Sequence, residues 1–218
     1  MSVVDAEAVL CGQRIIPVYT PGSETEAVAV ARALLQGGIG AIEVTLRTPV
    51  AIDALAAIAR DVPGMIVGAG TVLDVAQLHQ AQRAGARFAV SPGCVDELLL
   101  EARDASFAYL PGVATSSEVM KAFGVGYRLL KVFPAQAINA LALIAAWSGP
   151  FAQARFCPTG GIDAAHAAQY LAQPNVACLG GSWLTPKTLI ERGDWTQIEA
   201  LARAASALSR APSNEDLP

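Results

Sequence analysis

The sequence predicts an α/β protein that forms a single-domain (β/α)8, or TIM, barrel, and three observations lead to this prediction. Short apolar, β-branched runs alternate with helical stretches rich in alanine and leucine, which is typical of βαβ units in a parallel sheet. The runs are continuously apolar, as expected for parallel strands covered on both faces. Eight runs with about eight helices are the number that closes such a barrel. The runs begin near Ile15, Ile42, Ile66, Phe88, Ala108, Leu129, Phe156 and Ala177.

One domain accounts for the length. The chain has 218 residues, of which 53% are hydrophobic and 16% charged, and α/β barrels of this length commonly form one domain. Because no linker or low-complexity stretch divides the chain, we expect the barrel over residues 1–211 and a polar tail over 212–218. An open doubly wound sheet is the alternative. It is disfavoured because no G-x-G-x-x-G follows the first run, and the G-x-G at Gly68–Gly70 lacks the third glycine.

Helix starts follow the runs at regular places. A serine or threonine followed three residues later by glutamate predicts a capping box, and threonine before proline predicts a cap with proline in the first turn. The pair Gly37-Gly38 predicts the end of the first long helix. The predicted caps are Ser23 (with Glu26), Thr48 (before Pro49), Thr115 (with Glu118) and Thr196 (with Glu199).

Charge and hydropathy exclude two classes of partner. The net charge is −4, with 15 lysines and arginines against 19 acidic residues and no basic run, so we expect no nucleic acid. The longest apolar stretches, such as 140–147, are far shorter than the roughly 18 residues of a membrane span.

We expect a cytoplasmic protein with reduced thiols. The amino-terminal segment has no basic region and carries Asp5 and Glu7, so no secretory signal is visible. The four cysteines have no metal-like spacing and are expected to be small buried hydrophobic residues. They are Cys11, Cys94, Cys157 and Cys178.

The second run carries polar residues at every other position. Because side chains alternate along a strand, Glu43, Thr45 and Arg47 share one face, which we expect to point at the barrel axis with Arg47 nearer the rim. In a barrel of this kind the active site lies at the carboxyl ends of the strands. A carboxylate and a guanidinium there suit acid–base chemistry and binding of a substrate carboxylate. The structural alternative is an internal ion pair.

The sixth run contains Lys131 among apolar neighbours. A lysine that is desolvated in an apolar pocket loses its proton more easily than arginine does, and only the neutral amine attacks a carbonyl to form a Schiff base. The alternative is a lysine that reaches the strand edge or pairs with Glu43 for structural reasons.

Two glycine pairs follow the last two runs. Thr159-Gly160-Gly161 and Gly180-Gly181-Ser182 stand where barrels often bind phosphate through backbone N–H groups. Thr71 places a hydroxyl at the rim after the third run, and Pro92 ends the fourth run sharply.

Both histidines lie inside helical patterns. His79 and His166 are remote from the ends of the runs, so neither a histidine zinc site nor a Ser–His–Asp triad is predicted. A site for a hard cation has only Glu43 as an obvious ligand. We therefore expect no metal.

As a set, these segments resemble the bacterial 2-keto-3-deoxy-6-phosphogluconate (KDPG) and 4-hydroxy-2-oxoglutarate (KHG) aldolase family. The resemblance runs collinearly from about residue 15 to residue 208. The family implies a class I, metal-free aldolase on a (β/α)8 barrel, a homotrimer, with a role in the Entner–Doudoroff pathway. The segments that carry it are Glu43–Thr48, Val67–Thr71, Ser91–Gly93, Lys131–Pro134 and Phe156–Gly161.

The resemblance also implies roles for single residues. Lys131 would form the Schiff base and Glu43 would be the general acid and base. Arg47, Thr71 and Pro92 would surround the carboxylate and ketone of the pyruvate unit, and Phe133 would wall the pocket. Gly160, Gly161 and Ser182 would hold the phosphate. Thr159 would line the site beside the phosphate, and Gly181 lies in the same loop as Ser182.

One segment departs from the family pattern. After the Lys-x-Phe-Pro motif, members of the family often have an acidic residue and then Asn-Gly-Gly, whereas this chain has Gln136-Ala-Ile-Asn-Ala140. This departure leaves the Schiff-base lysine intact and bears on the sugar-phosphate end and on substrate preference.

The resemblance implies reversible cleavage of KDPG to pyruvate and glyceraldehyde 3-phosphate, without a cofactor. Within the enzymes, the alternatives are cleavage of 4-hydroxy-2-oxoglutarate to pyruvate and glyoxylate, a galactonate-series keto-deoxy phosphate as substrate, and a metal-assisted barrel aldolase. A non-catalytic barrel that binds phosphosugars is the alternative from another class. It is disfavoured because three polar residues inside a low-charge barrel are costly to keep without a function.

Overall fold

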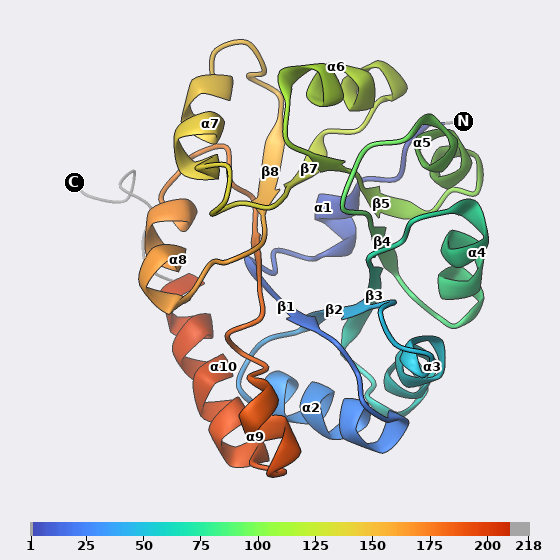
Figure 1. The fold of residues 1–218 in the computed structure, drawn as a ribbon, viewed down its shortest axis with the longest axis vertical. Coiled ribbons are helices and arrows are strands. Elements are labelled where there is room, and N and C mark those ends of the chain that lie inside the picture. Colours follow the sequence, from blue (N-terminus) through green and yellow to red (C-terminus); the bar gives the residue numbers. More distant parts are fainter. Residues whose placement is uncertain (1, 210–218) are drawn as a thin grey trace.

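The computed structural model describes residues 2–209, which form a ring of parallel strands with helices around it (Figure 1). The predicted barrel architecture is confirmed, and each of the eight apolar runs contains a strand. The tail predicted over 212–218 lies outside the described residues. The strands are β1 (Ile15–Tyr19), β2 (Ala41–Thr45), β3 (Ile66–Gly70), β4 (Phe88–Val90), β5 (Ala108–Leu110), β6 (Gly112–Val113), β7 (Leu129–Val132), β8 (Arg155–Pro158) and β9 (Leu179–Gly181).

The parallel ladder is interrupted at two places, so the barrel is not fully closed by continuous pairing. One part runs β5-β4-β3-β2-β1-β9 and the other β6-β7-β8. Pro111 separates β5 from β6 within the fifth run, since proline has no N–H to donate. Between β8 and β9 only the isolated bridges Phe156–Val176 and Thr159–Gly180 are present. The ring is completed across these two interruptions, which are called seams below.

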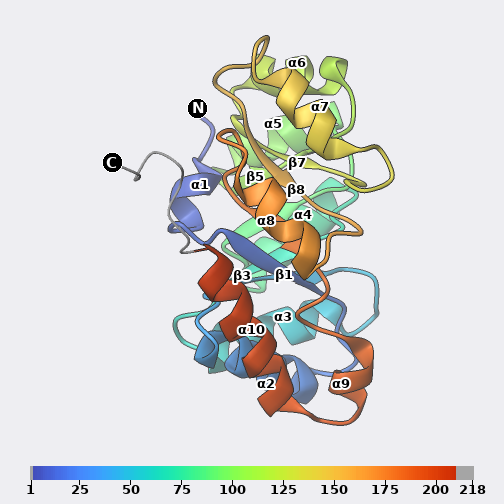
Figure 2. The same ribbon diagram turned by 90° about the vertical axis from the view of Figure 1, so that its left-hand side faces the viewer.

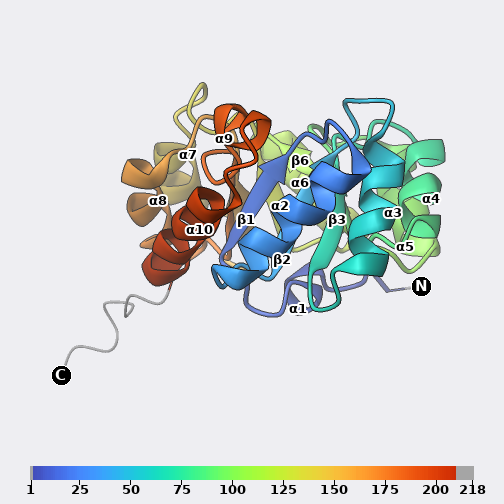
Figure 3. The same cartoon turned by 90° about the horizontal axis from the view of Figure 1, so that it is seen from below.

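Helices cover the outside of the ring, and α1 lies across one end of it. Figures 2 and 3 show α1 at the end of the barrel opposite α9. Among the described residues no helix is long and apolar enough to cross a membrane. The helices are α1 (Ala6–Val9), α2 (Glu24–Gln36), α3 (Ala51–Asp61), α4 (Val75–Arg83), α5 (Asp96–Asp104), α6 (Ser116–Val125), α7 (Ala140–Trp147), α8 (Ala164–Leu171), α9 (Lys187–Glu191) and α10 (Trp195–Ser209).

Two of the four predicted helix caps are confirmed and two are wrong. Ser23 caps α2, and Thr115 caps α6 within a complete capping box. Thr48 does not cap α3, because its hydroxyl donates instead to a carbonyl in the loop after β1. Thr196 lies inside α10, and the carboxylate of Asp194 accepts the hydrogen bond at this helix start at 3.1 Å. Aspartate just outside the helix is the better-placed acceptor.

Two apolar cores hold the barrel. The larger lies between the strands and the surrounding helices, and the smaller lines the barrel interior and continues to α1. Cys157 and Cys178 belong to the inner core, as predicted. The same prediction is wrong for Cys11, which is exposed, and for Cys94, which is half-buried. The inner core includes Ala6, Leu10, Ile16, Phe88, Val90, Leu110 and Leu129.

Candidate active site

Lys131 and Glu43 meet inside the barrel. The Nζ atom of Lys131 donates to Oε1 of Glu43 at 3.2 Å, and the two residues are only 5% and 4% exposed. With β5 and β6 counted as one position, strands β7 and β2 stand four places apart in either direction round the ring, so this contact crosses the barrel axis. Both side chains therefore point inward from opposite walls.

A glycine makes room for this pair. Gly70 lies on β3 next to β2, with Thr45 as its register partner. A Cβ atom on Gly70 would overlap the carboxylate of Glu43. The Glu43 side chain thus occupies the space that a side chain on the neighbouring strand would otherwise fill.

Two further groups complete the surroundings of Lys131. Its Nζ lies 5.2 Å from the centroid of the Phe133 ring, within the range of a cation–π contact. Cys157 on β8 is its register partner, so the two side chains leave neighbouring strands on the same face. A hydrogen bond with Cys157, together with burial, raises the pKa of Cys178 well above its usual value.

Arg47 does not lie on a strand, which corrects the sequence prediction. Strand β2 ends at Thr45, and the backbone N–H of Arg47 bonds back to the Thr45 carbonyl at 2.8 Å, which turns the chain. The exposed Arg47 side chain donates from Nε to the hydroxyl of Thr71 at 3.1 Å. The turns after β2 and β3 thus bring Arg47 and Thr71 together.

Thr71 has an unusual backbone. Its φ of 58° is left-handed, a region in which a β-branched residue is strained. This conformation directs its hydroxyl to the guanidinium of Arg47 while the chain leaves β3.

Thr45 is fully buried on the inward face above Glu43, as predicted. Its hydroxyl bonds that of Thr20 at 2.8 Å, a residue that the sequence analysis did not single out. Thr20 directly follows the first apolar run, so a search for polar residues after each run would have found it.

The loops after β8 and β9 lie side by side. Gly160 and Gly161 have φ values of 105° and 77°, which favour glycine at both positions. The hydroxyl of Thr159 donates to the Cys157 carbonyl at 3.3 Å, and Thr159 bridges Gly180 across the seam. Gly181 is buried and Ser182 is exposed at the end of β9. The two loops thus bring five residues into one neighbourhood at the ends of β8 and β9: Thr159, Gly160, Gly161, Gly181 and Ser182.

The divergent segment contacts this neighbourhood. The backbone N–H of Gln136 donates to the Gly160 carbonyl at 3.0 Å. A Cβ atom on Gly161 would lie 2.9 Å from Cβ of Gln136, so the glutamine side chain packs directly over that glycine. Pro92 is half-buried at the end of β4.

The histidines lie apart from these residues. His79 on α4 pairs with Glu101 at 2.8 Å, and His166 on α8 pairs with Asp163 at 2.7 Å. Within residues 2–209 no three His, Cys, Asp or Glu side chains gather in a way that could hold a metal ion.

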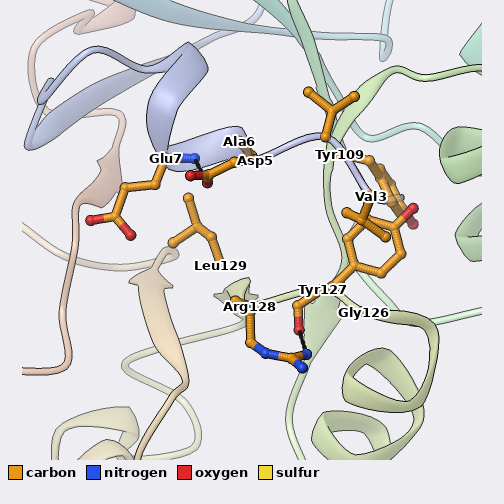
Figure 4. A pocket seen from close by; sticks show the side chains of 10 residues that line it. Val3, Asp5, Ala6, Glu7, Tyr109, Gly126, Tyr127, Arg128 and Leu129 are labelled. Carbon is orange, nitrogen blue, oxygen red and sulfur yellow. Dashed lines mark hydrogen bonds between the residues drawn. The ribbon is translucent and has the colours of Figure 1, made fainter. Parts of the chain in front are cut away.

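A cavity of about 330 Å³ opens at the opposite end of the barrel (Figure 4). The amino-terminal segment before and within α1 forms one wall, and Arg128 and Leu129 at the start of β7 form another. This cavity is separate from the Lys131–Glu43 pair. Its remaining lining residues are Val3, Val4, Asp5, Ala6, Glu7, Tyr109, Gly126 and Tyr127.

Comparisons with known proteins agree on one family. The family model described as KDPG and KHG aldolase matches residues 6–201. The 2-dehydro-3-deoxy-phosphogluconate aldolase of Pseudomonas aeruginosa is 48% identical over 197 residues, 90% of each chain. The KHG/KDPG aldolase of Escherichia coli K12 is 46% identical over 200 residues, 92% of this chain and 94% of that protein.

Solved structures of similar proteins include two with small molecules. The KDPG aldolase of Legionella pneumophila, with pyruvate captured as a covalent carbinolamine, has a TM-score of 0.89 at 44% identity and covers 92% and 98% of the two chains. That of Zymomonas mobilis ZM4 with 3-phosphoglycerate has a TM-score of 0.90 at 42% identity and covers 96% and 98%.

Proposed function

The chain belongs to the KDPG and KHG aldolase family, and on this basis we propose that it is a class I aldolase that reversibly cleaves 2-keto-3-deoxy-6-phosphogluconate to pyruvate and glyceraldehyde 3-phosphate. The observation that carries the proposal is the contact between Lys131 Nζ and Glu43 Oε1 across the barrel axis. It provides an amine for imine formation and a carboxylate for proton transfer at one point of the barrel interior.

The first half of the reaction uses Lys131 as nucleophile. Its neutral amine attacks the C2 ketone to give a carbinolamine, which loses water and becomes an iminium ion. Glu43 lies close enough to receive the proton that the ammonium must lose, and it returns this proton to the carbinolamine hydroxyl, which leaves as water. The iminium then accepts the electron pair of the C3–C4 bond as that bond breaks.

Glu43 acts in the second half as base and then as acid. It removes the C4 hydroxyl proton, directly or through a water, and the aldehyde leaves. The remaining enamine takes a proton at C3 from Glu43, and water hydrolyses the iminium to release pyruvate and the Lys131 amine. Each proton that the carboxylate takes is returned in a later step.

The remaining residues orient the substrate. The two terminal nitrogens of Arg47 suit a bidentate contact to the substrate carboxylate, because within the described residues only its Nε makes a hydrogen bond, to Thr71. Pro92 and Phe133 border the ketone end. The Thr159–Gly161 and Gly181–Ser182 loops hold the phosphate, so binding energy remote from the reaction orients the bond to be broken.

Borohydride trapping tests this function directly. Pyruvate and sodium borohydride are added to the full chain, which is then digested and analysed by mass spectrometry. We expect a reduced pyruvyl adduct on the peptide that contains Lys131. An adduct on another residue, or none, would overturn the proposal.

The name of the Escherichia coli relative supports a second substrate, 4-hydroxy-2-oxoglutarate, which would give pyruvate and glyoxylate. Comparing kcat/KM for this compound, for KDPG and for its galactonate-series epimer separates the three. We expect KDPG to be preferred over 4-hydroxy-2-oxoglutarate, because the glycine loops after β8 and β9 contribute only when a phosphate is present.

The assembly we propose is a cytoplasmic homotrimer. Leu73, Val95, Leu100 and Met120 expose apolar surface on or just before α4, α5 and α6, which supports contacts between subunits. Light scattering of the purified protein should give three times the mass of one chain. A monomeric mass would contradict the proposed trimer and would leave the catalytic proposal standing.

A further inference from the structure

Two buried hydroxyls connect the wall of the barrel with the turn at Pro92. Ser91 and Tyr109 are 1% and 0% exposed, and their oxygens lie 2.6 Å apart. Ser91 directly precedes Pro92, which borders the ketone end of the substrate in the proposed function. The catalytic steps derived above use neither hydroxyl.

The donors in this pair can be identified by counting protons. The Ser91 hydroxyl has one proton, and it donates to the Gly93 carbonyl at 2.6 Å. The Tyr109 hydroxyl must therefore donate to Ser91, and the backbone N–H of Gly112 also points to Ser91 Oγ at 3.4 Å. Ser91 then gives one hydrogen bond and accepts two, which is its full capacity.

Tyr109 is a dependable donor in this place. Burial raises its pKa far above the usual value for tyrosine, so it keeps its proton at any pH at which the enzyme works. Its ring is fixed by an edge contact with Tyr127, at 5.6 Å between centroids. A rigid ring therefore holds the start of the hydrogen-bond chain.

The end of the chain lies next to the Schiff-base strand. Gly112 on β6 is the register partner of Lys131 on β7. A Cβ atom on Gly112 would overlap the backbone of Pro92 and would lie 2.7 Å from the Gly93 nitrogen. The Pro92–Gly93 turn thus packs against the backbone of Gly112 beside Lys131. The hydrogen bonds of Ser91 hold the turn in this place.

We propose that Tyr109 and Ser91 are positioning residues, which hold the Pro92–Gly93 turn against the strand pair that carries Lys131 and so fix the wall of the keto-acid pocket. This inference rests on the proposed function. The turn borders the carboxylate and ketone end of the substrate and supplies neither the nucleophile nor the proton donor of the reaction. Loosening it should therefore weaken binding more than it slows the chemical step.

The test uses Tyr109→Phe, Ser91→Ala and the double variant in the full chain. We expect each single change to raise the KM for KDPG, and the half-saturating pyruvate concentration in borohydride trapping, about five- to tenfold, with kcat within about twofold. The double variant should match the singles within about twofold, because all three break one chain.

Tyr127→Phe is the matched control. Tyr127 is a buried tyrosine that donates to the Leu99 carbonyl at 2.8 Å, and it borders the same cavity as Tyr109 (Figure 4). It makes no hydrogen bond to the turn. We expect this variant to lose stability similarly while its KM stays at the wild-type value.

Two results would overturn the inference. One is wild-type KM in Tyr109→Phe, a variant that keeps the ring and therefore the packing. The other is an equal rise in KM in Tyr127→Phe, which would show a general effect of lost stability. If wild-type protein fails to trap pyruvate on Lys131, the proposed function itself fails, and that outcome is seen before any variant is compared.

Discussion

At the scale of single residues, the site depends on a charged pair that is nearly excluded from water. Lys131 and Glu43 are 5% and 4% exposed and lie 3.2 Å apart. Removing one member of a buried pair leaves an uncompensated charge, at a cost of about 3 to 5 kcal/mol. A substitution of Lys131 should therefore keep the positive charge, so that loss of activity can be separated from loss of folding.

Lys131→Arg keeps the charge and removes the nucleophile, since a guanidinium does not lose its proton in proteins. We expect aldol cleavage and pyruvate trapping to fall below detection, with a cooperative unfolding transition retained. Lys187→Arg is the control, because that side chain is 87% exposed on α9. Substantial turnover by Lys131→Arg would contradict the Schiff-base role.

Thr71 combines backbone strain with a hydrogen bond to Arg47, and two substitutions separate these effects. Thr71→Gly removes both the strain and the hydroxyl, so we expect unfolding free energy to rise by about 1 kcal/mol while kcat/KM falls about tenfold. Thr71→Ala loses the hydroxyl and keeps the strained φ of 58°. It should lose activity equally without gaining stability. Denaturant titration measures the unfolding free energy, and steady-state kinetics measures kcat/KM. Equal stability of the two variants would show that the backbone of Thr71 is not strained.

At the scale of elements, the helix starts are determined by which polar side chain stands just outside the first turn. Asp194 accepts the hydrogen bond of the Gln197 N–H at the start of α10, whereas Thr196 is already inside that helix. Asp163 caps α8 in the same way. The chain thus uses aspartate caps where a serine or threonine motif is absent, as at α8, or lies inside the helix, as at α10.

We expect Asp194→Ala to lower the free energy of unfolding by about 1 kcal/mol and Thr196→Ala to change it by less than about 0.5 kcal/mol. Urea titrations of the two variants measure the difference. If Thr196 capped the helix, as the sequence alone suggests, Thr196→Ala would be the more destabilising of the two variants. That result would contradict the observed start of α10.

At the scale of the whole molecule, the ring depends on the weak seam between β8 and β9. Only two isolated bridges join these strands, and one of them, Thr159–Gly180, also brings the two glycine loops together. A Cβ atom on Gly180 would overlap the Thr159 hydroxyl. Barrel closure and the proposed phosphate site thus share one close approach.

Gly180→Ala should open this seam. We expect a loss of about 1 to 3 kcal/mol in unfolding free energy, as for other overpacked positions, and a higher KM for KDPG. Gly149→Ala is the matched control, because nothing lies within 4 Å of the place that a Cβ atom on Gly149 would take. Wild-type stability in Gly180→Ala would mean that the seam can spread without cost.

The architecture and the choice of the two residues proposed to react follow from the amino-acid order alone. Each strand could be located because its signal is local: an apolar run, a turn residue, then a helical stretch. Lys131 and Glu43 could be singled out because each is a charged residue within such a run. The role of each site residue came through resemblance to a family, because residue type does not by itself specify a chemical step.

Which residues meet became visible only in the folded chain. Lys131 and Glu43 lie 88 positions apart in the chain, and their contact exists because the ring of strands places β2 and β7 on opposite walls. Arg47 lies in a turn because a backbone hydrogen bond ends β2 two residues earlier. The Tyr109–Ser91 pair joins neighbouring strands through side chains of ordinary type. Local patterns specify elements, whereas contacts across a barrel depend on its closure, which no short segment of sequence encodes.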